Sequence, residues 1–218
     1  MRGAPQGAPL SPLLANVSMR RFVRGWKTPG HETRLEAHLV NDADDFVICG
    51  RGRADEAMSA MRGMMAELRL TVNEAKTRPC RDPEETFDFL GYTLGRCGSA
   101  RAGRSYIGTR PSAKAVRRIK REISDQTDAR WQHLDARGMV GRLNRKLLGW
   151  ANSFRLGPVG RAYRALERHS AARLRQWLQR KHKSESRGTR LFSDPYLHEG
   201  LGLVRLTEPP KSYRWANA

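Results

Sequence analysis

The fold of this chain is decided over residues 39–48, which read LVNDADDFVI. Two apolar runs, Leu39–Val40 and Phe46–Ile48, flank a cluster of Asn and Asp residues, and this pattern predicts a β-hairpin. Asp44 and Asp45 then lie where the chain reverses. Asp is common in turns because its side chain bonds nearby backbone groups, so the pair fits an ordinary turn. Carboxylates that project from a reversal can also hold a metal ion for phosphoryl transfer, and both interpretations stay open at this point.

Helices and a second hairpin are predicted around this stretch. Residues 9–24 begin with Pro-Leu-Ser-Pro, and Ser11 can cap a helix whose first position is Pro12. Met and Leu recur at spacings of three and four over residues 55–69, which predicts a helix with a Met stripe in the core. Residues 87–92 (FDFLGY) have strand character and return through a turn as residues 105–108, which predicts the second hairpin.

The chain becomes helical after Pro111. Ser112 can cap a helix whose apolar stripe is Val116, Ile119 and Ile123. Apolar faces follow over residues 140–154 and 161–183, and three basic helices in a row predict a helical bundle. We expect the apolar residues 201–204 to dock on this bundle.

The charge is concentrated in the second half of the chain. The 218 residues carry a formal charge of +19. Residues 1–100 hold 14 basic and 13 acidic residues, whereas residues 101–218 hold 27 and 9. Such a field attracts polyanions, of which nucleic acid is the first candidate, and the binding should weaken with salt. The alternatives are an Arg-rich composition with a solvated surface and an anionic membrane surface.

Composition excludes two classes of protein. No apolar run approaches the roughly 20 residues that a membrane span needs, and apolar residues recur too regularly for a wholly disordered chain. Cys49, Cys80 and Cys97 lack metal-ligand spacing, so we expect free thiols and a cytoplasmic location.

Several motifs occur together in a recognisable order. Residues 3–16 (GAPQGAPLSPLLAN) precede the hairpin of residues 39–48, and Leu70, Asn73, Lys76-Thr77 and residues 87–92 follow it. This order resembles the palm motifs of group II intron reverse transcriptases, the intron-encoded maturases. Residues 143–154 (LNRKLLGWANSF) and 174–182 (LRQWLQRKH) resemble their maturase-specific domain, also called domain X or thumb. The resemblance covers nearly the whole chain.

The resemblance implies an α+β fold and an activity. A partial reverse-transcriptase palm, built from antiparallel hairpins and helices, would occupy residues 1–110. A helical thumb would occupy residues 111–183, with its C-terminal tail at 184–218. The implied activity is Mg²⁺-dependent RNA-directed DNA polymerisation on intron RNA, together with splicing. The implied partners are the intron RNA and a DNA primer or target, with no membrane, and a separate chain could complete the palm.

The resemblance also assigns roles to individual residues. Template and nucleotide would contact the loop of Pro5, Gln6 and Gly7. Catalysis and Mg²⁺ binding would fall to Asp44 and Asp45, with Lys76 near the leaving pyrophosphate, although Lys76 also fits a solvated surface. The primer end would be gripped by a hairpin made of Phe89, Leu90, Gly91 and Tyr92, of which Phe89 and Leu90 also fit plain core packing. RNA would contact Arg117, Arg118, Lys120, Arg121, Arg145, Lys146, Arg175, Arg180 and Lys181.

Two departures from the family pattern shape the expectations. The family has a first metal-binding Asp upstream of the Pro-Gln-Gly loop, so we expect a C-terminal fragment of a longer enzyme that is inactive alone. The family has Tyr where this chain has Asp42, and strand alternation would place Asp42 and Asp44 on one face. Three hypotheses therefore remain, namely a polymerase, a non-catalytic RNA-binding splicing cofactor, and a decayed fragment.

Overall fold

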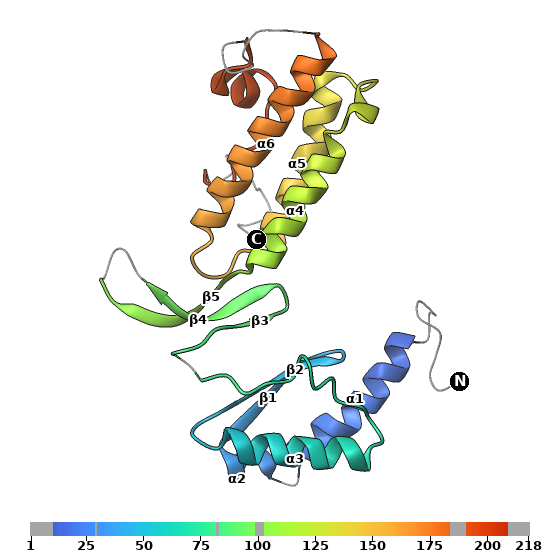
Figure 1. Cartoon of the computed structure of the whole chain (residues 1–218), viewed down its shortest axis with the longest axis vertical. Coiled ribbons are helices and arrows are strands. Elements are labelled where there is room, and N and C mark those ends of the chain that lie inside the picture. The colour runs from blue at the N-terminus through green and yellow to red at the C-terminus, as the bar shows by residue number, and fades with distance from the viewer. Residues whose placement is uncertain (1–10, 29, 82, 99–102, 184–190, 209–218) are drawn as a thin grey trace, which may run out of the picture. The chain divides into compact units, whose positions relative to one another are not determined.

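The computed structural model describes residues 11–28, 30–81, 83–98, 103–183 and 191–208. The chain forms two compact units, Met1–Arg81 and Asp82–Ala218 (Figure 1), and each has its own hydrophobic core. The fold combines helices with antiparallel hairpins, as the α+β prediction requires. The predicted domain limits at residues 110 and 183 stay a prediction.

The first unit places a hairpin against three helices. Its elements are α1 (Ser11–Lys27), α2 (His31–Leu35), β1 (Ala37–Asp42), β2 (Asp45–Gly50) and α3 (Ala54–Glu67). Strands β1 and β2 pair antiparallel, from Ala37 opposite Gly50 to Asp42 opposite Asp45. The hairpin predicted from residues 39–48 is confirmed, because its apolar residues alternate toward the helices while the Asn/Asp cluster closes the end.

The core of the first unit is built by α1 and α3 on one face of the hairpin. Phe22 and Trp26 of α1 are fully buried, and the Trp26 Nε1–H donates to the Ala37 carbonyl oxygen at 2.9 Å. Met61 and Met65 of α3 are also buried in this cluster. The Met stripe is therefore core packing, as its spacing predicted.

A three-stranded sheet opens the second unit. Strands β3 (Phe87–Phe89), β4 (Tyr92–Gly98) and β5 (Ser105–Pro111) pair antiparallel in the order β3-β4-β5. The hairpin between β4 and β5 was predicted. Phe87, Phe89 and Tyr92 are strand residues, as predicted, and a two-residue turn at Leu90 and Gly91 divides them between β3 and the start of β4.

Helices complete the second unit. They are α4 (Ala113–Gln126), the short η1 (Ala129–Trp131), α5 (Ala136–Ser153), α6 (Gly160–Lys181) and η2 (Tyr196–Gly200). The Ser112 hydroxyl oxygen accepts from the Ala115 N–H, which confirms the predicted cap, and Asp135 caps α5 in the same way.

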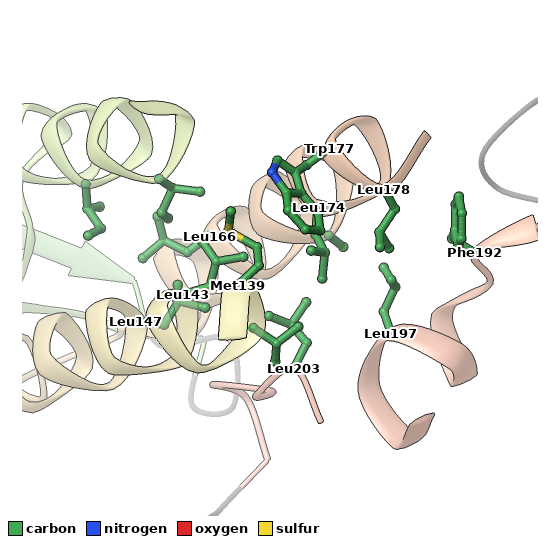
Figure 2. Packing of buried hydrophobic residues seen from close by; sticks show 14 residues of the cluster. Met139, Leu143, Leu147, Leu166, Leu174, Trp177, Leu178, Phe192, Leu197 and Leu203 are labelled. Carbon is green, nitrogen blue, oxygen red and sulfur yellow. The ribbon is translucent and has the colours of Figure 1, made fainter. Parts of the chain in front are cut away.

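The bundle core lies between α4, α5 and α6. Leu143, Leu147, Leu166, Leu174 and Trp177 are fully buried, and Figure 2 shows their side chains converging between the helices. Leu197 and Leu203 from the end of the chain join the same cluster. The expected docking of residues 201–204 is thus confirmed. Asn144 Nδ2 donates to the Gly202 carbonyl oxygen and Asn144 Oδ1 accepts from the Val204 N–H, which holds the segment in place.

No helix among the described residues is long and apolar enough to cross a membrane. The thiols of Cys49 and Cys97 form no disulfide.

Candidate nucleic-acid interface

The acidic end of the first hairpin is open to solvent. Ala43 and Asp44 form its two-residue turn, and Ala43 has a left-handed backbone with a φ of 51°. Asp42, Asp44 and Asp45 are all exposed, and none makes a side-chain hydrogen bond or ion pair with another described residue. The prediction that Asp42 and Asp44 lie on one face of a strand is wrong, because Asp44 belongs to the turn rather than to a strand. Asp42 instead lies directly opposite Asp45.

The body of this hairpin is held by neighbouring elements. Phe46 of β2 packs against Phe22 of α1, with ring centroids 5.2 Å apart. The Leu39 N–H of β1 donates to Glu32 Oε1 of α2 at 3.1 Å, in addition to the strand pairing. The two strands that lead into the Asp44 turn are therefore held against α1 and α2.

The donor chemistry of this turn fits Mg²⁺. This ion prefers hard oxygen ligands and is often held by one or two carboxylates, with substrate phosphates and waters completing the octahedron. Asp44 and Asp45 supply such a pair. Within the described ranges no group of three or more His, Cys, Asp or Glu side chains is arranged to hold a metal ion.

Of the other residues predicted for the polymerase site, Lys76 is the one that belongs to the described part of the first unit. Pro5, Gln6 and Gly7 lie outside the described residues. Lys76 is exposed in a turn where its N–H and that of Thr77 both donate to the Asn73 carbonyl oxygen, at 3.0 Å each. The predicted primer-grip residues 89–92 belong to the second unit.

The turn at Leu90 and Gly91 is fixed against the helices. Both residues have positive φ, 50° and 80°, as a type I′ hairpin turn requires. The Gly91 carbonyl oxygen accepts from the Ser112 N–H at 2.9 Å, and the Tyr92 hydroxyl donates to the Ser153 carbonyl oxygen at 2.8 Å. This places Leu90, which is 53% exposed, beside the start of α4 and the end of α5.

A groove of about 900 Å³ begins at this turn and runs between α4 and α5. Its apolar lining includes Ile119, Trp150 and Phe154, and the last two rings stack with centroids 4.5 Å apart. Five cationic side chains also line it: Lys114, Arg118, Arg142, Arg145 and Lys146. A groove with an aromatic wall and several cations is suited to a polyanion that carries flat or apolar groups.

One carboxylate interrupts the cations of the groove. Glu122 Oε2 lies 2.9 Å from Lys146 Nζ, and Glu122 Oε1 lies 3.2 Å from Arg118 Nε. The hydrogen bond from Lys146, followed by the contact with Arg118, lowers the pKa of Glu122 below its usual value despite some desolvation. The Arg142 guanidinium is held differently, 3.9 Å from the centre of the Trp131 ring.

The predicted RNA-binding residues divide into three groups. Arg118, Arg145 and Lys146 line the groove. Two others are engaged inside the unit: Arg175 donates to the Phe192 carbonyl oxygen and pairs with Asp194, and Lys181 donates to the Gln132 carbonyl oxygen. The rest lie on α4 and α6 outside the groove lining: Arg117, Lys120, Arg121 and Arg180. Their roles as RNA contacts stay predictions.

Sequence reasoning missed Lys114, Glu122, Arg142 and Trp150 as parts of the groove. A usable signal was present, because Lys114, Arg118 and Glu122 recur every four residues and so share one face of α4. Residues 142, 146, 149, 150 and 153 recur in the same way on α5. Their meeting across two helices, however, depends on tertiary packing.

The helical bundle carries a groove of cations and aromatic rings, which is the surface chemistry of a nucleic-acid-binding domain. Residues 1–94 match the family model for reverse transcriptase (RNA-dependent DNA polymerase), and residues 116–193 match the model for the group II intron maturase-specific domain. The chain belongs to the group II intron reverse transcriptase/maturase family. No curated protein matches it.

Proposed function

We propose that the chain binds group II intron RNA through the groove between α4 and α5 and acts there as a maturase. The two matched domains imply binding of RNA and DNA. The observation that carries the proposal is the groove itself, in which five cations line one space with Trp150 and Phe154. Its helices lie largely within the region that matches the maturase-specific domain.

The chemistry of the groove suits a backbone rather than base edges. In A-form RNA the major groove is too deep and narrow for side chains, so proteins contact phosphates and 2′-hydroxyls across the minor groove. The cations of α4 and α5 would neutralise phosphates, while Leu90 and the aromatic wall would cover sugars. Binding of this kind follows RNA shape and falls steeply with salt.

A salt titration tests this proposal. We expect the full chain to bind a folded intron RNA more tightly than an unstructured RNA of equal length in fluorescence anisotropy. Arg145→Gln should weaken binding about threefold and make the salt slope shallower by about one. Arg145 is exposed and makes no side-chain hydrogen bond or ion pair with another described residue, so the change leaves no orphaned partner.

The matched control is Arg168→Gln, which removes the same charge from an exposed position on α6 outside the groove lining. Its affinity should stay within twofold of wild type by the same reasoning, since it loses no groove contact. Equal losses in the two variants, or an affinity that is insensitive to salt, would contradict the proposal.

Metal-dependent polymerisation is the second candidate function. Reverse transcriptases use divalent metal ions, and the exposed Asp44–Asp45 turn offers two carboxylates of suitable chemistry. Mg²⁺ held there would offset charge on the reacting phosphates. Asp44 would orient the ion, and Lys76 would stabilise charge on the departing pyrophosphate.

Primer extension on an RNA template tests this second function. This function requires Mg²⁺-dependent product from the wild type and none from Asp44→Ala, whereas a fragment that is inactive alone gives no product from either. Product that does not exceed that of Asp44→Ala would reject catalysis by this chain while leaving RNA binding untouched.

A further inference from the structure

We propose that Glu122 occupies the place of a nucleic-acid phosphate in the free protein. A backbone phosphate then binds between Arg118 and Lys146 by displacing the Glu122 carboxylate. This inference rests on the proposed function of the groove and adds a specific anion subsite to it.

The Glu122 carboxylate bridges two cations in the way that a phosphate would. Each carboxylate oxygen of Glu122 meets one cation, Lys146 from α5 at 2.9 Å and Arg118 from α4 at 3.2 Å. Two non-bridging oxygens of a phosphodiester accept hydrogen bonds in the same divided way. A carboxylate that bridges two cations is thus a close chemical substitute for a phosphate.

The three side chains are accessible to a ligand that enters the groove. They lie in the groove, and Glu122 is the one acidic residue among its described lining. The side chain of Arg118 is 84% exposed, that of Lys146 37% and that of Glu122 34%. A ligand in the groove can therefore reach both cations without unfolding either helix.

The bundle does not depend on these ion pairs. Helices α4 and α5 already meet through Ile119, Ile123, Leu143 and Leu147, which are at most 2% exposed. Partly exposed ion pairs contribute little to stability, typically about 0–1 kcal/mol. Displacement of the Glu122 carboxylate by a phosphate therefore costs little folding stability. The main effect of the carboxylate is to keep the two cations occupied in the free protein.

This arrangement favours long polyanions over single anions. A lone phosphate must compete with a carboxylate that is covalently held at the site, so its gain is small. A nucleic-acid strand that already contacts Lys114 and Arg145 presents its next phosphate at high local concentration. Glu122 thereby raises the threshold for weak anionic ligands.

The variant Glu122→Gln tests the inference. The probe is a fluorescein-labelled 20-base-pair RNA duplex, titrated with the full chain between about 50 and 300 mM NaCl. We expect Glu122→Gln to bind about five- to tenfold tighter than wild type at low salt, with a slope steeper by about one to two. Inorganic phosphate should compete better against the variant than against wild type.

The matched control is Asp125→Asn. Asp125 is exposed one turn along α4, does not line the groove, and makes no side-chain bond with another described residue. Asp125→Asn changes the net charge by the same unit as Glu122→Gln but frees no cation of the groove. We therefore expect its affinity for the duplex to rise less than twofold. A gain equal to that of Glu122→Gln would reduce the effect to net charge and overturn the inference.

A double-mutant cycle supplies an independent measurement. Lys146→Gln should change affinity little in the wild-type background, because Glu122 engages Lys146 there, and should lower it clearly in the Glu122→Gln background. Equal effects in both backgrounds, or weaker binding by Glu122→Gln with an unchanged melting temperature, would overturn the inference. If no variant binds the duplex, the proposed function of the groove fails instead.

Discussion

Single residues fix the turn at the mouth of the groove. Gly91 has a φ of 80°, and a Cβ added there would lie 3.0 and 3.1 Å from two carbons of the Phe154 ring. Its neighbour Leu90 also has positive φ, an uncommon state for a bulky side chain. The strained backbone therefore lies at Leu90, whose side chain is exposed at the mouth of the groove.

Gly91→Ala should destabilise the second unit. The added methyl group meets both a left-handed backbone and the Phe154 ring, so we expect a loss of about 1–2 kcal/mol in the free energy of unfolding. Urea unfolding followed by tryptophan fluorescence measures it. Gly98→Ala is the control, because its Cβ meets nothing within 4 Å. Equal losses of unfolding free energy in both variants would show that neither the Phe154 contact nor the left-handed backbone at residue 91 contributes to the effect.

At the scale of elements, a histidine in the contact between α4 and α6 makes the stability of the protein depend on pH. His169 of α6 places Nε2 3.0 Å from the Lys120 carbonyl oxygen and 3.1 Å from Ser124 Oγ, both on α4. Burial lowers the pKa of His169 below its usual value, and the cationic Lys120 and Arg173 act in the same direction against a hydrogen bond that raises it. The folded state therefore holds the imidazole neutral more strongly than the unfolded chain does.

The stability of the α4–α6 contact should fall in mild acid. The unfolded chain binds the proton first, so the free energy of unfolding should be full above about pH 6.5 and decrease as pH falls toward the lower folded pKa. Urea unfolding between about pH 5 and 7.5 measures this. His169→Gln should flatten the profile, whereas His133→Gln, at an exposed position, should not. An unaltered slope in His169→Gln would contradict the assignment.

The first hairpin carries a repulsion between its strands. Asp42 and Asp45 lie opposite each other as the closing pair, and like charges in that position are unfavourable. Asp42→Asn should raise the stability of the first unit by about 0.5 kcal/mol, with urea unfolding as the measurement. Asp55→Asn removes the same charge from the first turn of α3, where a carboxylate is favourable, so this control should not raise stability. Destabilisation by Asp42→Asn would mean that the carboxylate has a structural role.

The same elements show what sequence reasoning can reach. The hairpin of residues 39–48 was predictable because its apolar pairs and its turn residues lie within one short segment. The turn at Leu90–Gly91 was expected only from the family resemblance, because Leu is not a usual residue at positive φ and hydrogen bonds to Ser112 and Ser153 hold the turn there. The groove itself was not predicted, although three of its five cations were named as RNA contacts, because it forms between two helices whose pairing is not local.

At the scale of the whole molecule, the two hydrophobic clusters share no residue. Leu143→Ala should therefore leave a cavity in the second unit alone, at a cost of about 2–5 kcal/mol. Hydrogen exchange read by mass spectrometry should show lost protection in peptides from α4, α5 and α6 and none in peptides from α1 and α3. Lost protection in both sets would show that the units unfold together.

The sheet β3-β4-β5 has a consequence for how such proteins could recombine. The reverse-transcriptase match ends at residue 94, within β4, yet β4 and β5 pair along their full lengths. A Cβ at Gly157, in the loop between α5 and α6, would lie 1.8 Å from the Thr109 carbonyl oxygen of β5, so sheet and helices are fitted to each other. A chimera joined at residue 94 would break this fit. One joined after Arg81 would transfer sheet, turn and groove as a single inherited module.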